Sequence, residues 1–113
     1  MNMKNTELRA ELRVEVTRRG ALTAGGAEGF PCVVQDMSDS GMLIMCTRPL
    51  IVGQTLQFKC DLFPDKTLEC VIEVVHISED GVGTKIIEID EPGMKLIQLF
   101  LQEHFTDKVK RWV

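Results

Sequence analysis

The sequence predicts an all-β domain with a C-terminal helix, built as a six-stranded antiparallel β-barrel. Three observations lead to this fold class. Hydrophobic and polar residues alternate along most of the chain, turn-forming residues recur between the alternating segments, and after Asp90 the apolar spacing changes to three or four residues. With 113 residues, of which 44% are hydrophobic and 27% charged, the chain has the length and composition of one globular domain.

The first strand is marked by Leu12, Val14 and Val16, which alternate with polar residues and place Arg13 on the solvent side. Residues 20–29 follow with four glycines, and we expect them to form a mobile connection without regular structure. Five further strands, separated by short turns, are expected at 30–35, 42–46, 56–62, 68–76 and 82–89. Six strands with short connections favour a closed barrel, because closure leaves no strand edge exposed.

A helix is predicted over residues 92–112. Pro92 suits the first helical turn, and Asp90 and Glu91 suit the cap and the positive end of the helix. Apolar residues then recur at helical spacing, at Met94, Ile97, Leu101, Phe105, Val109 and Trp112. This stripe is expected to cover a mouth or face of the barrel. The alternative is that it pairs two subunits, so both a monomer and a homodimer remain open.

Charge and composition argue against several classes of partner. The chain has 13 Lys and Arg against 17 Asp and Glu, a net charge of -4, and 5% aromatic residues. We therefore expect no DNA or RNA partner, because duplex binding needs neutralised phosphates and single strands need aromatic platforms. No apolar run reaches the ~18 residues of a membrane helix, and the N-terminus lacks the apolar core of a signal peptide. No membrane insertion and a cytoplasmic location are expected.

Metal and enzyme chemistry are not expected either. The chain has four cysteines without a close pair, Cys32, Cys46, Cys60 and Cys70. We expect them to be reduced, to pack as small hydrophobic side chains and to bind no metal. The sequence shows no Ser-His-Asp arrangement, glycine-rich phosphate loop or pair of metal-binding carboxylates, so we expect neither an enzyme nor a cofactor.

Charge is distributed unevenly along the chain. Residues 1–20 contain five basic and three acidic side chains, a charge of +2, and the remaining 93 residues carry 8 - 14 = -6. A basic segment joined to an acidic body suggests a local anion site. The alternative for the charge pattern alone is a solvated N-terminal segment.

Two short motifs stand out together. Arg9-Ala-Glu-Leu-Arg13 precedes the first strand, and Asp36-Met-Ser38-Asp-Ser-Gly41 forms the first hairpin. The pair resembles the signature of the PilZ family, which is Arg-x-x-x-Arg followed by Asp or Asn, x, Ser, x, x, Gly. The order of elements, a six-stranded barrel with a trailing helix, is similar to that family over nearly the whole chain.

This resemblance implies a receptor for the bacterial second messenger cyclic di-GMP, with Arg9, Arg13, Asp36, Ser38 and Gly41 as ligand-binding residues. Arginine can donate two parallel hydrogen bonds to phosphate oxygens or to the O6 and N7 atoms of guanine. A carboxylate can accept hydrogen bonds from the N1 and N2 donors of guanine. The serine is expected to donate to phosphate or base, and the glycine to allow an unusual backbone angle or close approach. Further candidate contacts are Leu8, Ser40, His76 and Gly83.

Residues 1–12 are interpreted as a flexible basic arm, and residues 13–113 as a PilZ-like barrel domain. Leu8 occupies a position where other members carry an additional arginine, which favours a single bound ligand. His76 is expected to be half-buried, and Arg18 and Arg19 to add positive charge or to be solvated residues of a strand end. Ordering of the arm on the ligand would change the surface offered to an effector protein. The alternative is a ligand-independent adaptor that acts only through protein contacts.

Overall fold

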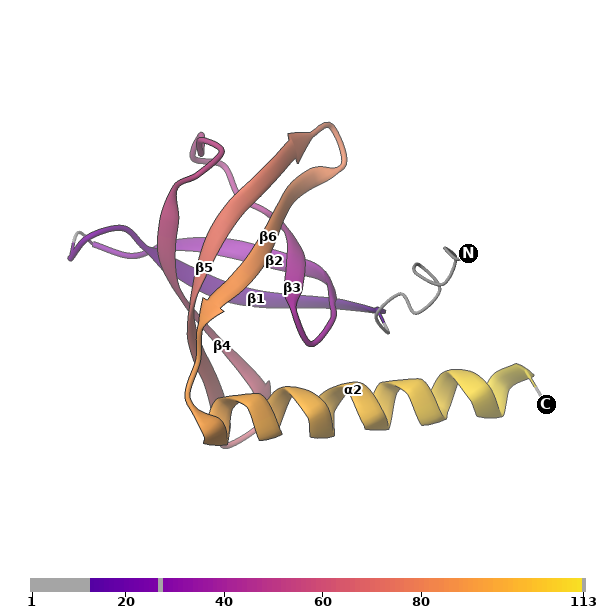
Figure 1. The fold of residues 1–113 in the computed structure, drawn as a ribbon. Coiled ribbons are helices and arrows are strands. Elements are labelled where there is room, and N and C mark those ends of the chain that lie inside the picture. The colour runs from indigo at the N-terminus through magenta and orange to yellow at the C-terminus, as the bar shows by residue number, and fades with distance from the viewer. Residues whose placement is uncertain (1–12, 27, 113) are drawn as a thin grey trace, which may run out of the picture.

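The computed structural model describes residues 13–26 and 28–112, with backbone only for 105–112. Six antiparallel strands close into a barrel in the order β1-β2-β3-β6-β5-β4 (Figure 1), which confirms the predicted fold class. The strands are β1 (Val14–Thr23), β2 (Phe30–Met37), β3 (Gly41–Met45), β4 (Thr55–Phe63), β5 (Lys66–Ser78) and β6 (Gly81–Glu88). A helix, α2 (Glu91–Trp112), follows the last strand.

Side chains that alternate along the strands fill the inside of the barrel. In β4, Leu56, Phe58, Cys60 and Leu62 are buried, and the residues between them are exposed. β5 begins with the same alternation, which places Leu68, Cys70, Ile72 and Val74 in the core as the sequence predicts. The period of two therefore decides which face of each strand is apolar.

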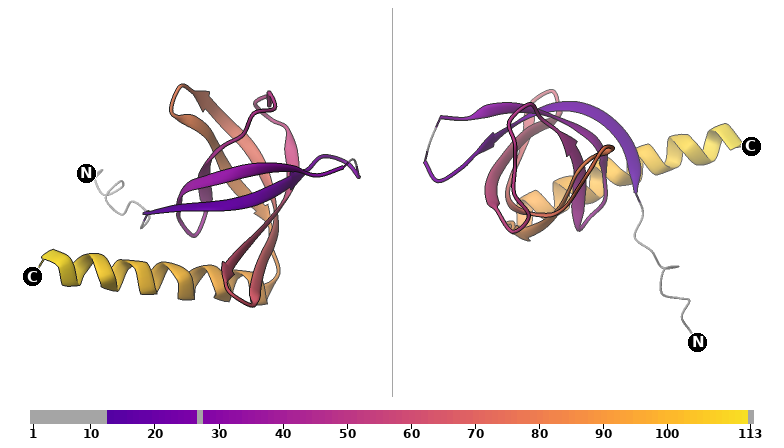
Figure 2. Two further views of the ribbon diagram at one scale, coloured as in Figure 1. Left: turned by 180° about the vertical axis from the view of Figure 1, so that it is seen from behind. Right: turned by 90° about the horizontal axis from the view of Figure 1, so that it is seen from above.

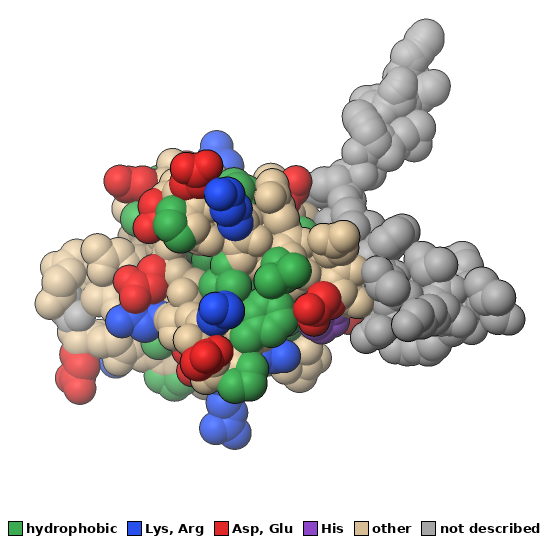
Figure 3. Space-filling model, turned by 90° about the horizontal axis from the view of Figure 1, so that it is seen from below, with side chains coloured by type: hydrophobic (Ala, Val, Ile, Leu, Met, Phe, Trp, Pro, Cys, Tyr) green, Lys and Arg blue, Asp and Glu red, His purple; other side chains and the backbone are tan. Residues whose placement is uncertain are grey.

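Helix α2 lies across one end of the barrel and continues past it (Figures 1 and 2). Asp90 caps the helix, because its Oδ1 accepts a hydrogen bond of 2.8 Å from the Gly93 amide. Ile97, Phe100 and Leu101 are buried against the barrel, so the first half of the predicted stripe covers the core. Viewed from the α2 side, a group of hydrophobic side chains is surrounded by charged ones (Figure 3).

The prediction for residues 20–29 is partly wrong, because Gly20 to Thr23 belong to β1. All four residues pair with β4, and the first three of them also pair with β2 on the other side. A Cβ atom on Gly20 would lie 3.0 Å from the Lys59 carbonyl oxygen and 3.1 Å from the Phe58 ring. The glycine therefore provides room for close packing inside a regular strand.

Candidate functional site

A β-bulge in β2 turns Asp36 away from the core. Earlier in this strand Phe30, Cys32 and Val34 are buried. The register with β3 then shifts between Val34 and Asp36, so the next fully buried residue is Met37. Without the inserted residue the alternation would place the Asp36 carboxylate inside the barrel. The bulge instead directs it to the outer face, as bulges do at many functional sites.

Arg13, immediately before β1, forms an ion pair with this carboxylate. Its Nη1 donates to Asp36 Oδ1, and the two side chains are 42% and 22% exposed. Glu15 lies directly opposite Asp36 in the β1–β2 register, so two acidic side chains are neighbours here. The Arg13 guanidinium therefore lies where two negative charges meet, and it is still open to solvent on one side.

Ser38 is fully buried and organises the turn between β2 and β3. Its Oγ accepts from the amides of Ser40 and Gly41, both at 3.2 Å, and lies 3.3 Å from the Gly41 carbonyl oxygen. The Ser38 amide donates to that same carbonyl at 2.9 Å. The hydroxyl is thus bonded within the turn, where it fixes the backbone that follows Asp36.

Gly41 is required by the close approach of two strands. A Cβ atom there would lie 2.1 Å from the Thr84 carbonyl oxygen and 3.1 Å from the Lys85 Cα, both on β6. The positive-φ glycines in the described residues are Gly25, Gly26, Gly53 and Gly81, so an unusual backbone angle at Gly41 is not the reason for this residue. The glycine instead brings β3 against β6, and a hydrogen bond from the Ile86 amide to the Ser40 carbonyl strengthens the contact.

The strand registers align several candidate residues in one row on the outside of the barrel. Glu15 pairs with Asp36, Asp36 with Leu43, Leu43 with Gly83, and Gly83 with His76. His76 is exposed, which corrects the expected half-burial, because β5 extends past the buried part of the barrel. The row therefore crosses β1, β2, β3, β6 and β5 beside the turn.

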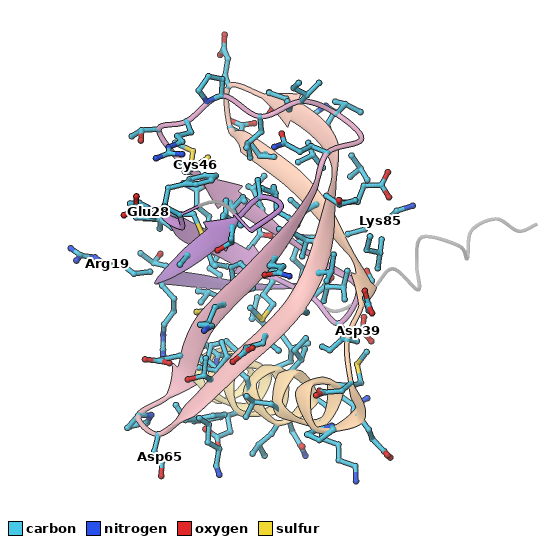
Figure 4. The ribbon with its side chains drawn as sticks, turned by 90° about the vertical axis from the view of Figure 1, so that its left-hand side faces the viewer. Arg19, Glu28, Asp39, Cys46, Asp65 and Lys85 are labelled. Carbon is cyan, nitrogen blue, oxygen red and sulfur yellow. The ribbon has the colours of Figure 1, made fainter. Side chains whose placement is uncertain are left out.

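The turn itself lies at one edge of this surface. Figure 4 shows Asp39 at its tip, on the same side of the barrel as Lys85. Ser40 is exposed next to it, and both residues border a hollow of about 480 Å³ that reaches the end of β6 and the start of α2. Leu8 and Arg9 lie outside the described residues, so the structure does not place the first half of the arginine motif.

Arg18 has a role that the sequence did not reveal. Its Nη1 donates to the carbonyl oxygens of Asp61 at 3.1 Å and Leu62 at 2.9 Å, and its guanidinium carbon lies 5.3 Å from the centre of the Phe100 ring. It therefore joins β1 to β4 and α2, which corrects the interpretation of Arg18 as a solvated residue of a strand end. Arg19 is exposed and points away from the barrel (Figure 4).

Neither a metal centre nor a membrane-spanning segment is found in the described part of the chain. Among residues 13–26 and 28–104, whose side chains the structure describes, no group of three or more His, Cys, Asp or Glu could hold a metal ion. Over residues 13–26 and 28–112, no helix has both the length and the apolar character needed to cross a membrane.

Burial raises the pKa of the Cys70 thiol to about 12, so this thiol stays protonated in the core.

The fold of this chain is similar to that of solved PilZ proteins. The PilZ domain of Escherichia coli YcgR with c-di-GMP has a TM-score of 0.69 at 10% identity, over 91% of this chain and 95% of that one. MotI (DgrA), the Bacillus subtilis inhibitor of motility, has a TM-score of 0.72 at 14% identity, over 90% of this chain and 51% of that one. MrkH from K. pneumonia, in its apo state, has a TM-score of 0.73 at 14% identity, with coverages of 91% and 53%.

The chain thus spans about half the length of MotI and of MrkH. A search of curated proteins gave no match. A family model described as PilZ domain matches residues 7–103, which includes both motifs and all six strands. On the strength of this match over most of its length, the chain belongs to the PilZ domain family.

Proposed function

We propose that this domain is a receptor for cyclic di-GMP, a ring of two guanosines joined by two phosphodiesters. The observation that carries the proposal is the exposed Arg13–Asp36 ion pair beside a turn whose shape is fixed by Ser38 and Gly41. Membership of the PilZ family supports it, as does the fold shared with the YcgR domain solved with c-di-GMP. A binding module without catalytic chemistry is the function that this site supports.

The two charged groups match different parts of this ligand. The Arg13 guanidinium can donate two parallel hydrogen bonds to phosphate oxygens or to the O6 and N7 atoms of guanine. The Asp36 carboxylate can accept hydrogen bonds from the N1 and N2 donors of guanine, a pair of donors that adenine lacks. In the free protein the two groups bond each other, so ligand binding would exchange one internal ion pair for contacts with the ligand.

Ser38 and Gly41 support the site through the geometry of the turn. The Ser38 hydroxyl is buried and bonded to the turn backbone, so we assign it to holding Asp36 in place. Ser40 and His76 are exposed and Gly83 is half-buried, and these residues flank the same surface as Asp36. They are the candidates for additional contacts with the bases of the ligand.

We propose that residues 1–12, which include Arg9, act as an arm that completes the site. Arg9 is four positions before Arg13, and we propose that it binds the ligand together with the Arg13 side chain. An arginine at position 8 would favour binding of a second ligand molecule. Because this chain has Leu8 there, we propose that one molecule binds. Ordering of the arm would change the surface presented to an effector protein, and a cytoplasmic location follows from this role.

Calorimetric titration with cyclic di-GMP tests the proposal. We expect a Kd in the micromolar range or tighter, and Arg13→Ala should weaken binding by about 2 kcal/mol, roughly 30-fold, through lost charged hydrogen bonds. Arg19→Ala is the matched control, because this exposed arginine on β1 pairs with Val33, away from Asp36. Asp36→Ala should reduce the preference for cyclic di-GMP over cyclic di-AMP.

Added salt should weaken binding, because phosphate contacts are screened. Absence of binding heat at high ligand concentration, together with an unchanged melting temperature, would contradict the receptor function. The ligand-independent adaptor would then be the better description.

A further inference from the structure

Cys32 on β2 and Cys46, just after β3, each lie one residue beyond the pair Val33–Met45. The β2–β3 register pairs Val34 with Ile44 and Val33 with Met45. One more step along both strands brings Cys32 opposite Cys46. Opposite residues in antiparallel strands have Cα atoms roughly 4.5–5.5 Å apart, which is within the range that a disulfide requires.

A further observation brings the two cysteines together, although the Cys32 Sγ lies on the β1 side, 3.4 Å from where a Cβ atom on Gly20 would be. Both cysteines line the same apolar hollow of about 460 Å³, together with Val33 and Met45. Burial, and to a smaller extent the neighbouring Cys46 and Cys60 thiols, raise the pKa of the Cys32 thiol to about 12.

The two thiols differ in their access to solvent. Cys32 is 3% exposed, whereas Cys46 is half-buried. The Cys46 Sγ lies 3.3 Å from the Arg48 carbonyl oxygen, its hydrogen-bond acceptor. Figure 4 shows Cys46 on the side of the barrel that also carries Arg19 and Glu28, away from the turn at Asp39. A small reagent can therefore reach Cys46 first.

We propose that Cys32 and Cys46 form a reversible disulfide when the protein meets a low-molecular-weight disulfide such as glutathione disulfide. The Cys46 thiolate attacks one sulfur of the reagent, whose S–S bond breaks and releases one glutathione thiolate. The buried Cys32 thiol, whose pKa is raised to about 12, must then lose its proton to attack the Cys46 sulfur of the mixed disulfide as a thiolate, so this second step is the slow one. The second glutathione leaves as a thiol, so the protein loses two hydrogens and the reagent gains them.

The bridge would connect the two strands at the open end of the hairpin that carries Asp36 and the Ser38 turn. A covalent link across a hairpin restricts the unfolded chain, so the bridged protein should melt several degrees higher than the reduced protein. This inference does not depend on cyclic di-GMP, and it can fail or succeed independently of the proposed function.

Peptide mapping of the full chain tests the proposal. The protein is incubated with glutathione disulfide and excess reagent is removed; the protein is then unfolded in urea, free thiols are alkylated, and trypsin is added. Trypsin cuts after Arg19 and Lys59 but not before Pro49, so fragment 20–59 contains Cys32 and Cys46 and neither of the other cysteines. We expect this fragment to be two hydrogens lighter and not alkylated, and dithiothreitol to reverse the change. Fragments with Cys60 and Cys70 should be alkylated.

Two variants separate the steps. Cys32→Ser should accumulate a glutathione adduct on Cys46, and Cys46→Ser should give neither an adduct nor a bridge. Cys70→Ser, which removes a buried thiol on β5, is the control and should still form the bridge. Complete alkylation of Cys32 and Cys46 in the wild-type protein, a stable mixed disulfide without a bridge, or a bridge to Cys60 would each overturn the proposal.

Discussion

Replacing Ser38 by alanine should destabilise the free protein, because the turn depends on this hydroxyl. The substitution leaves the backbone in place but removes the acceptor of the Ser40 and Gly41 amides, each 3.2 Å from Oγ. Gly41 is buried, so its amide would lose its partner without access to water. Asp36 is two residues before Ser38, so the position of the carboxylate depends on the same turn.

The expected loss follows from these contacts. A hydrogen bond contributes about 1 kcal/mol, and a buried donor left without a partner costs roughly 1–3 kcal/mol. We therefore expect Ser38→Ala to lower the free energy of unfolding by about 2 kcal/mol. For a chain of this size, that corresponds to a fall in Tm on the order of 10 °C.

Thermal and urea unfolding without ligand measure this effect, and the chain offers a matched control. Ser78-Glu-Asp-Gly81 has the same Ser-x-x-Gly spacing between β5 and β6, and the Ser78 Oγ accepts from the Asp80 amide at 3.1 Å. Both partners are exposed there, so Ser78→Ala should change stability by less than about 0.5 kcal/mol. If Ser38→Ala leaves stability unchanged but abolishes ligand binding, the hydroxyl contacts the ligand directly and our assignment is wrong.

Three further predictions concern the rest of the fold. Gly41→Ala should cost about 3 kcal/mol in chemical denaturation, because its Cβ would overlap the Thr84 carbonyl, and an unchanged midpoint would contradict this contact. Arg18→Ala should cost about 2 kcal/mol and increase hydrogen exchange in α2, whereas the exposed Arg19→Ala should change neither. Burial raises the pKa of three thiols from 9.0 to about 12, 11 and 12, at Cys32, Cys60 and Cys70 respectively. The unfolded chain releases these protons more readily, so the free energy of unfolding should fall as the pH rises above about 9, and a Tm that stays constant up to pH ~11 would contradict the burial of the thiols.

The alternation of apolar residues was sufficient to predict the barrel. Side chains in β4 and β5 follow the period of two without interruption over their buried parts, so strand positions and inward faces could be assigned from sequence. The change of period after Asp90 likewise predicted the helix and its cap. The Asp-x-Ser-x-x-Gly motif identified the hairpin, because those residue types favour turns for local reasons.

Features that depend on contacts between distant strands could not be predicted in this way. The glycine at position 20 suggests a loop when read locally, and only the approach of β4 explains why it lies in a strand. Arg18 is indistinguishable in sequence from Arg19, although one bonds carbonyl groups 43 and 44 residues away and the other is exposed. Phe100 falls between the positions of the predicted helical stripe, and it is buried because Phe63 packs edge-on against it at 5.8 Å.

The first half of β1, with Arg13 just before it, connects the candidate site to the helix. Arg13 at its start bonds Asp36, and Arg18 bonds the end of β4 and contacts Phe100 on α2. Between them the β1–β2 register shifts, and Thr17 has a φ of 56°, a conformation that costs a β-branched residue roughly 1–3 kcal/mol. A ligand that separates Arg13 from Asp36 acts at the start of this bulged segment, and Arg18 follows directly after Thr17. We therefore expect any effect of binding on α2 to pass through β1, and a signal that survives Arg18→Ala would require another path.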